Sequence, residues 1–250
     1  MKKIVVSADQ HGALRDEATI EKTCEFAKYF RPDYLINLGD TWDFRSLRAG
    51  ASEEDQAYPL KDDLKCGEDT IERFFSSSPT AFKVHLWGNH SLRRIKRLQE
   101  SPRAVVAEAA DRIYDDIVSC VKRFTDVNLP YNKRTGVFEV EGFRFVHGYA
   151  HGIYAARKHA ITYGNCMFAH IHCKLVHTLE DLNASTAYCC PCSCDVDQDY
   201  NATQITTLRQ ENGFCYGFLD GDRGFYDIHY AMKRPDGTFF LPTEWNLNRI

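Results

Sequence analysis

Short apolar runs that end abruptly in polar residues constrain the fold of this sequence more than any other feature. Residues 4–8 form the first run and lead into Asp9-Gln10-His11, and residues 34–38 form the second and lead into Gly39-Asp40. Between them, residues 16–30 carry apolar side chains at helical spacing, which predicts a helix. The opening is therefore predicted to be a strand, a helix and a strand, which is the βαβ unit of α/β proteins.

The pattern continues along the chain and then changes character. Residues 81–87 predict a third strand that ends in Gly88-Asn89-His90, and helices are predicted over 91–98 and about 103–124. The second half predicts mostly strands around one helix at 153–163: the hairpin 137–140 and 143–146, then 166–169, 174–179, 185–190, 213–220 and 224–229. Because no linker separates the two halves, we expect a single domain over residues 1–250.

Residues 44–67 are less regular than their surroundings and rich in charged side chains. We expect this segment to be an insertion that lies over a cleft as a flap. A helix is predicted to begin only after it, from Glu68 to about Ser76. Basic and aromatic residues of the flap, together with Trp42 just before it, are expected to bind phosphate and stack on the substrate: Phe44, Arg45, Arg48 and Tyr58.

Length and composition exclude several classes of protein. The chain has 250 residues, of which 44% are apolar, enough for one domain with a full core. It lacks an apolar run of about 18 residues, so neither a membrane span nor a signal peptide is expected, and we predict a cytoplasmic location. The net charge of −4 argues against a protein that coats DNA regardless of sequence.

Ten cysteines are present, four of them between Cys189 and Cys194. A cytoplasmic chain of this length does not need disulfides, so reduced thiols are expected. The cluster lacks the paired two-residue spacing of a zinc ribbon, and adjacent cysteines fit a tetrahedral site poorly. We therefore expect it to pack in the core.

Carboxylates, imidazoles and one amide follow five of the apolar runs. They are Asp9 and His11; Asp40 and Asp43; Asn89 and His90; His147; and His170 and His172. Taken singly, Asp40 could cap a helix and His147 could be an ordinary core histidine. Taken together, they are the oxygen and nitrogen ligands that manganese, iron or zinc prefers.

This ordered set resembles the calcineurin-like metallophosphoesterases. The family motifs appear as Asp9-Gln10-His11, Gly39-Asp40-Thr41-Trp42-Asp43, Gly88-Asn89-His90, His147-Gly148 and His170-Ile171-His172. The chain also resembles bacteriophage-encoded members of that family. It departs from the family pattern at Ser91, where an acidic residue is usual, and at Ala169, where glycine is usual.

The resemblance implies a four-layer αββα sandwich of two mixed β-sheets flanked by helices. It also implies a hydrolase that uses two divalent metal ions, with manganese expected first and iron, zinc or nickel as alternatives. One ion would be held by Asp9, His11, Asp40 and His172, and the other by Asp40, Asn89, His147 and His170. His90 would face the scissile phosphate and stabilise or protonate the leaving oxygen, with Asp43 behind it.

Basic residues that follow the third strand suggest the substrate. Leu92, Ile95 and Leu98 are expected to point inward. The basic residues between them would line a rim near the metals and favour nucleic acid or a nucleotide. They are Arg93, Arg94, Lys96 and Arg97. Arg45 and His151 are further expected contacts, with a packing role as the equal alternative for His151. The same helix face could instead be an ordinary solvated surface. The alternatives for the whole chain are a phosphomonoesterase, including a Ser/Thr protein phosphatase, and a scaffold that keeps the fold without chemistry.

Overall fold

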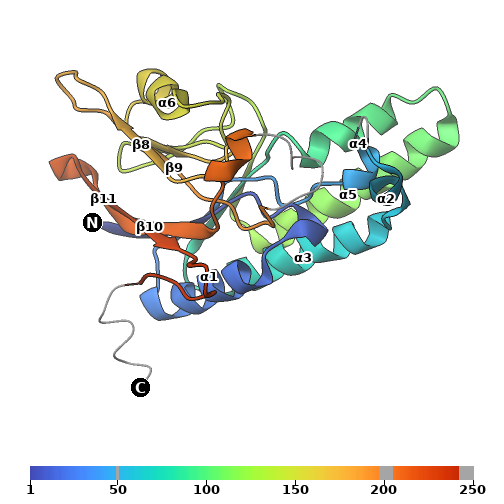
Figure 1. Cartoon of the computed structure of the whole chain (residues 1–250), viewed down its shortest axis with the longest axis horizontal. Coiled ribbons are helices and arrows are strands. Elements are labelled where there is room, and N and C mark those ends of the chain that lie inside the picture. Colours follow the sequence, from blue (N-terminus) through green and yellow to red (C-terminus); the bar gives the residue numbers. More distant parts are fainter. Residues whose placement is uncertain (49–50, 197–204, 242–250) are drawn as a thin grey trace.

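The computed structural model describes residues 1–48, 51–196 and 205–241. Two β-sheets pack against each other, and helices cover the outer side of each (Figure 1). The expected sandwich of two mixed sheets flanked by helices is therefore confirmed. Within the described ranges, no helix combines the length and the hydrophobicity that spanning a membrane requires.

The first sheet has six strands with a parallel centre. β1 (Lys2–Ser7), β2 (Tyr34–Asn37), β3 (Phe82–Leu86) and β4 (Val127–Leu129) run parallel. β10 (Gly213–Asp220) and β11 (Phe225–Met232) extend the sheet beside β1 as antiparallel strands, in the order β11-β10-β1-β2-β3-β4. β4 was not predicted from the sequence.

The second sheet has five strands in the order β5-β6-β7-β9-β8. They are β5 (Phe138–Val140), β6 (Phe143–Phe145), β7 (Cys166–Phe168), β8 (Leu175–Thr178) and β9 (Thr186–Cys189). β6, β7 and β9 run parallel, whereas β5 and β8 are antiparallel to their neighbours. The carboxyl ends of β6 and β7, which precede His147 and His170, therefore reach the same edge of the sheet.

Alternating side chains along β1 explain the layers. Val5 packs with the helices, whereas Ile4 and Val6 point the other way and meet Phe143 and Phe145 of the second sheet. Both faces of the strand are buried, as expected for the centre of an α/β sheet. The helices that cover the first sheet are α1 (Glu17–Phe30), α3 (Leu60–Ser76), α4 (Ser91–Gln99) and α5 (Ala104–Phe124), and α6 (Ala155–Tyr163) covers the second.

Two expectations for the segment after β2 were wrong. After η2 (Arg45–Leu47) and the short α2 (Glu53–Ala57), helix α3 begins at Leu60, well before its predicted start. Trp42 and Phe44 are fully buried in the core, so they do not stack on a substrate. Gly67 of α3 allows this burial, because a Cβ there would lie 2.0 Å from Trp42 Nε1. That nitrogen donates to Leu64 O at 3.1 Å.

Candidate metal centre

The polar residues that follow β1, β2, β3, β6 and β7 meet at one edge of the sandwich. Backbone hydrogen bonds join the first two loops, from Asp9 N to Gly39 O and from His11 N to Asp40 O, both 2.9 Å long. A further bond runs from His170 N to Asp9 Oδ2 at 2.9 Å and ties the second sheet to the first. These bonds set the distances between side chains that lie far apart in the sequence.

Five of the seven predicted metal ligands have a left-handed backbone. They are Asp9 (φ 52°), His11 (φ 54°), Asp40 (φ 51°), His170 (φ 77°) and His172 (φ 56°). Each such residue costs about 1–3 kcal/mol, and residues of this kind gather at functional sites. The surrounding fold therefore holds these side chains in orientations that the local backbone does not favour.

The first group of ligand atoms surrounds Asp40. One carboxylate oxygen of Asp40 and one ring nitrogen each of His147 and His170 lie within 4.8 Å of one another. Asn89 joins them, since its Oδ1 lies 3.0 Å from His147 Nε2. His147 is held in place by a hydrogen bond from its Nδ1 to Leu38 O at 2.8 Å. This geometry leaves Nε2 as the ring nitrogen that faces the group.

The second group also includes Asp40. Atoms of Asp9, His11 and Asp40 lie within 4.8 Å of one another. His172 Nε2 approaches this group, at 3.9 Å from Asp9 Oδ1 and 3.2 Å from His11 Nε2. Two ring nitrogens at this distance can share one proton in a hydrogen bond, and when both are unprotonated they can bind one cation together. Asp40 thus lies between the two groups, as the resemblance implies for a bridging ligand.

The chemistry of these atoms fits two divalent cations. Asp9 Oδ1 and Asp40 Oδ2 are buried without a hydrogen bond of good geometry, although His147 Nε2 lies 3.1 Å from the latter. Burial raises the pKa of Asp9, and the Asp40 carboxylate raises it further. Burial lowers the pKa of His170 to about 3 and that of His172 well below its usual range. Burial would also lower the pKa of the other two rings, but the neighbouring carboxylates outweigh it: Asp43 raises the pKa of His11 to about 9, and Asp40 raises that of His147. Divalent cations would take the place of those ring protons and would satisfy the buried carboxylate oxygens.

His90 belongs to neither of these two groups, and one of its ring nitrogens lies within 4.8 Å of ligand atoms of His11 and Asp43. It precedes α4, and its Nδ1 lies 2.6 Å from Asp43 Oδ1. Burial alone would raise the pKa of Asp43, but hydrogen bonds from His11 and His90 hold it well below its usual range. Arg94 also contacts Asp43 Oδ2 at 3.1 Å. Asp43 therefore remains a carboxylate that orients two imidazoles.

Ser91 replaces the usual acidic residue after Gly88-Asn89-His90, and the structure shows a different support. The Ser91 hydroxyl donates to Trp42 O at 3.0 Å and lies 3.3 Å from Trp42 N, which donates to it. It thus ties the turn to the loop after β2. The carboxylate beside His90 comes from Asp43 instead, so the departure from the family pattern leaves His90 with an acidic partner.

The expected substrate contacts differ in where they lie. Arg93 is exposed and lines a cavity of about 240 Å³ together with Asn89, His90 and Arg48. His151 Nε2 lies 3.1 Å from His170 Nε2, beside the first group. Arg45 instead packs its guanidinium 3.5 Å from the centre of the Tyr58 ring, and it does not line that cavity.

Asp63 is a residue of the centre that the sequence did not reveal. It is buried on α3, where Oδ1 accepts from Ala13 N at 2.9 Å and Oδ2 accepts from Phe44 N at 2.5 Å. One carboxylate thereby joins the loop that carries His11 to the loop that carries Asp43. The sequence did contain a signal that α3 begins before Glu68. It is the helical spacing of Leu60, Leu64, Gly67 and Ile71.

Replacing Asp63 with asparagine should destabilise the protein. The amide can accept from only one of the two backbone groups and turns a donor toward the other, which leaves a buried N–H unsatisfied. We expect the free energy of unfolding to fall by about 1–3 kcal/mol, measured by urea denaturation. Asp115→Asn, on the exposed face of α5, should change it by less than about 0.5 kcal/mol. Equal losses in both variants would contradict the role of Asp63.

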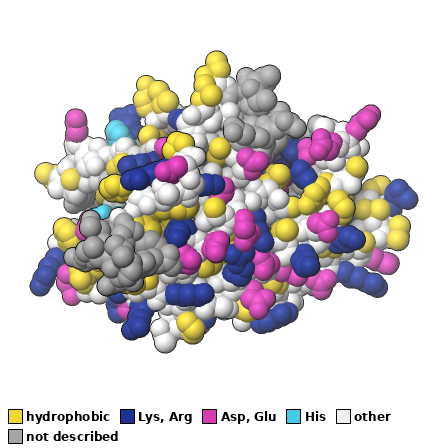
Figure 2. All heavy atoms as spheres, turned by 60° about the horizontal axis from the view of Figure 1, so that its bottom comes forward, with side chains coloured by type: hydrophobic (Ala, Val, Ile, Leu, Met, Phe, Trp, Pro, Cys, Tyr) yellow, Lys and Arg dark blue, Asp and Glu magenta, His cyan; other side chains and the backbone are white. Residues whose placement is uncertain are grey.

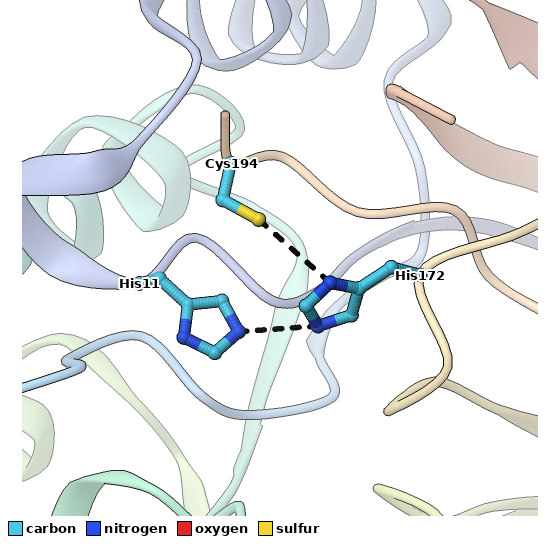
Figure 3. A group of neighbouring side chains, drawn as sticks. All are labelled: His11, His172 and Cys194. Atoms are coloured by element: carbon cyan, nitrogen blue, oxygen red, sulfur yellow. Dashed lines mark hydrogen bonds between the residues drawn. The ribbon is translucent and has the colours of Figure 1, made fainter. Parts of the chain in front are cut away.

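Cys194 also belongs to the centre, although the other cysteines of its cluster pack in the core as predicted. All four, Cys189, Cys190, Cys192 and Cys194, are fully buried. Figure 3 shows the Cys194 sulfur pointing at His172 Nδ1, while His172 Nε2 points at His11. The sulfur lies 3.9 Å from that Nδ1. If His172 binds metal through Nε2, the ring proton is on Nδ1, and this N–H donates a hydrogen bond to the sulfur.

Cys194→Ala should therefore weaken one metal site by about 10–100-fold, the usual cost of losing a partner behind a ligand. Cys194→Ser, which keeps an acceptor, should recover part of that affinity. The measurement is a competition titration of manganese and zinc against a chromogenic chelator. Cys120→Ala, which removes a buried thiol from α5, is the control. Metal affinities equal to wild type in both Cys194 variants would rule out this contact.

Comparison with known proteins gives structural matches only. No protein-family model and no curated protein matches the sequence. A crystal structure of the Vps29 mutant D62A from Entamoeba histolytica superposes with a TM-score of 0.50 at 10% identity, covering 95% of this chain and 96% of that one. Among other solved structures are a dimetal phosphatase from Danio rerio (TM-score 0.44, 12% identity, 88% and 93% coverage) and the nuclease MPE of Pseudomonas putida (0.34, 16%, 76% and 73%). At these identities, the Vps29 match concerns the fold alone.

Proposed function

We propose that this chain, which has the calcineurin-like metallophosphoesterase fold, is a metal-dependent phosphodiesterase that acts on nucleic acid or nucleotides. The observation that carries the proposal is the position of Asp40 between two groups of ligand atoms, one with Asp9 and His11 and the other with His147 and His170. Two divalent cations, when bound, would polarise phosphate oxygens and lower the pKa of a bound water, so that hydroxide is available near neutral pH. Manganese is the metal that we propose first.

The protein's own side chains complete the chemistry. His90 keeps its Nδ1 on the Asp43 carboxylate at 2.6 Å, and its side chain is 26% exposed. When the ring carries both protons, Nδ1–H donates to Asp43 and Nε2–H can pass its proton to the leaving oxygen of the ester, which leaves a neutral imidazole. A general acid in this position contributes about 10²–10⁴-fold to the rate. Arg93, beside it in the same cavity, can stabilise the charge that develops on the phosphate.

A phosphodiester is favoured over a monoester by the space around His90. A diester carries a second organic group, which needs room on the far side of the phosphate. The cavity beside His90 shares Arg93 and Arg97 with a second and larger cavity of about 560 Å³. The two adjoining cavities together give room for the second organic group. The arginines would also bind the phosphates of the neighbouring nucleotides.

Parallel hydrolysis assays test the proposal. The protein is stripped with EDTA, reloaded with manganese, and supplied with bis-p-nitrophenyl phosphate, p-nitrophenyl phosphate, single-stranded DNA and a phosphopeptide. We expect the metal to restore activity, with the diester and DNA cleaved faster than the two monoesters. A preference for the monoesters would favour a phosphatase. Two bound metals without hydrolysis of any substrate would instead indicate a scaffold. Reloading with iron, zinc or nickel identifies the metal that gives the highest rate.

A further inference from the structure

A cavity of about 560 Å³ lies between α4 and α5, next to the Gly88-Asn89-His90 turn. Its rim carries Arg93, Lys96 and Arg97 from α4 and Lys122 from α5, and its walls include Tyr114 and Tyr131. We call this cavity the α4–α5 trough. Its volume falls in the range of about 300–1,000 Å³ that small-molecule sites occupy.

We infer that the α4–α5 trough binds single-stranded nucleic acid, with phosphates on its basic rim and an unstacked base against Tyr131. The inference rests on the proposed function, since it assigns the substrate of the same centre. The trough is continuous with that centre in two ways. Arg93 and Arg97 line both the trough and the cavity that contains His90. The Tyr131 ring lies edge-on to the His147 ring, with ring centres 5.5 Å apart.

The charges on the rim are free to bind an anion. Among the described residues, no carboxylate lies within salt-bridge distance of Arg93, Lys96, Arg97 or Lys122, and Glu100 is the one acidic residue of the lining. The face that carries α1 and α3 is different, because it mixes both signs (Figure 2). There, Arg15 pairs with Glu17 at 2.9 Å and with Asp69 at 2.7 Å. Unpaired cations gathered along one cavity attract a polyanion.

Packing of α4 explains why its cations face the trough. Ile95 is fully buried, and Leu92 and Leu98 pack against the same core. Arg93, Lys96 and Arg97, at steps of three and four, therefore share the exposed side of the helix. Lys122 completes the rim from the neighbouring helix α5. The rim thus carries four cations on two helices, more than a single phosphate group can contact. This number favours a strand with several phosphates over a free nucleotide.

Tyr131 is suited to stacking on a base. It is 36% exposed, and its ring stacks on Tyr149 with centres 5.0 Å apart and planes at 22°. Its hydroxyl donates to Gly148 O at 3.2 Å, so the ring is held from both sides. Aromatic rings accept any unpaired base on their face, whereas the bases of a duplex are already stacked and cannot enter.

Binding of a fluorescein-labelled (dT)₈ oligonucleotide, followed by fluorescence anisotropy in EDTA, tests the rim without hydrolysis. For single strands, the salt slope of log K is about −0.7 per neutralised phosphate. The double variant Lys96→Gln/Lys122→Gln should therefore bind more weakly and reduce this slope by about 1.4. Lys28→Gln/Lys158→Gln, which removes two exposed lysines from α1 and α6, should keep the wild-type slope. An unchanged slope in the trough variant would overturn the inference.

A second pair of variants tests the base. Tyr131→Ala should weaken (dT)₈ binding by about tenfold, and Tyr131→Phe, which keeps the ring, should restore it. Equal affinity of Tyr131→Ala and wild type would overturn the base contact. Competition by dTMP as effective as by (dT)₈ would show a mononucleotide site instead of a strand. These binding results do not depend on turnover: if the wild type binds (dT)₈ but hydrolyses no ester, the proposed function fails and the trough remains.

Discussion

Asp40→Asn is expected to lower hydrolysis of bis-p-nitrophenyl phosphate by at least about a thousandfold and to reduce bound metal from two ions to one or none. The substitution preserves shape, and the amide oxygen can still accept the hydrogen bond from His90 N that reaches Asp40 Oδ1 at 2.8 Å. What it removes is the negative charge shared by both ligand groups. Metal ions supply several kcal/mol of transition-state stabilisation, and each 1.36 kcal/mol corresponds to a factor of ten in rate.

Metal content by plasma emission spectroscopy and initial rates provide the measurement for Asp40. Asp222→Asn is the matched control, because Asp222 is an exposed carboxylate on η5 (Gly221–Arg223). It should bind two metals and hydrolyse the diester like wild type. If Asp40→Asn retained both metals and more than a tenth of the activity, Asp40 would not lie between two cations and the proposed function would lose its main support.

His90→Asn is expected to lower kcat by about 10²–10⁴-fold while leaving two metals bound. The reason is that His90 Nδ1 is directed to Asp43 at 2.6 Å, so the ring acts on the substrate through its other nitrogen. The loss should depend on the leaving group. p-Nitrophenolate departs without a proton, whereas the alkoxide of a DNA strand needs one, so the loss should be larger for the oligonucleotide.

Rates on the two substrates and metal content, measured on the same preparation, test the role of His90. His177→Asn on β8 replaces a histidine outside the centre and serves as the control. If bound metal fell together with activity, His90 would be a metal ligand. An equal loss on both substrates would show that it stabilises the charge of the phosphate and does not protonate the leaving oxygen.

The local pattern was sufficient to predict the strands that precede the loops of the centre. Apolar runs such as residues 4–8 and 34–38 are buried on both faces, so burial alone makes them recognisable. The segment after β2 was harder, because Trp42 and Phe44 follow a polar turn and look exposed from their neighbours in the sequence. They are core residues because α3 packs against them, with Gly67 in contact with Trp42. This packing joins residues that are distant in the sequence, so no local pattern indicates it.

The sequence by itself determined which side chains are available for a metal centre. Each predicted ligand follows a strand, and the carboxyl ends of parallel strands meet at the same edge of a sheet. Only the tertiary structure decided which groups support them. Asp63 on α3 joins two ligand loops, Cys194 reaches His172, and Arg94 contacts Asp43. These contacts connect residues about 20 to 50 positions apart. They depend on how helices pack on the sheet, which no periodicity along the chain records.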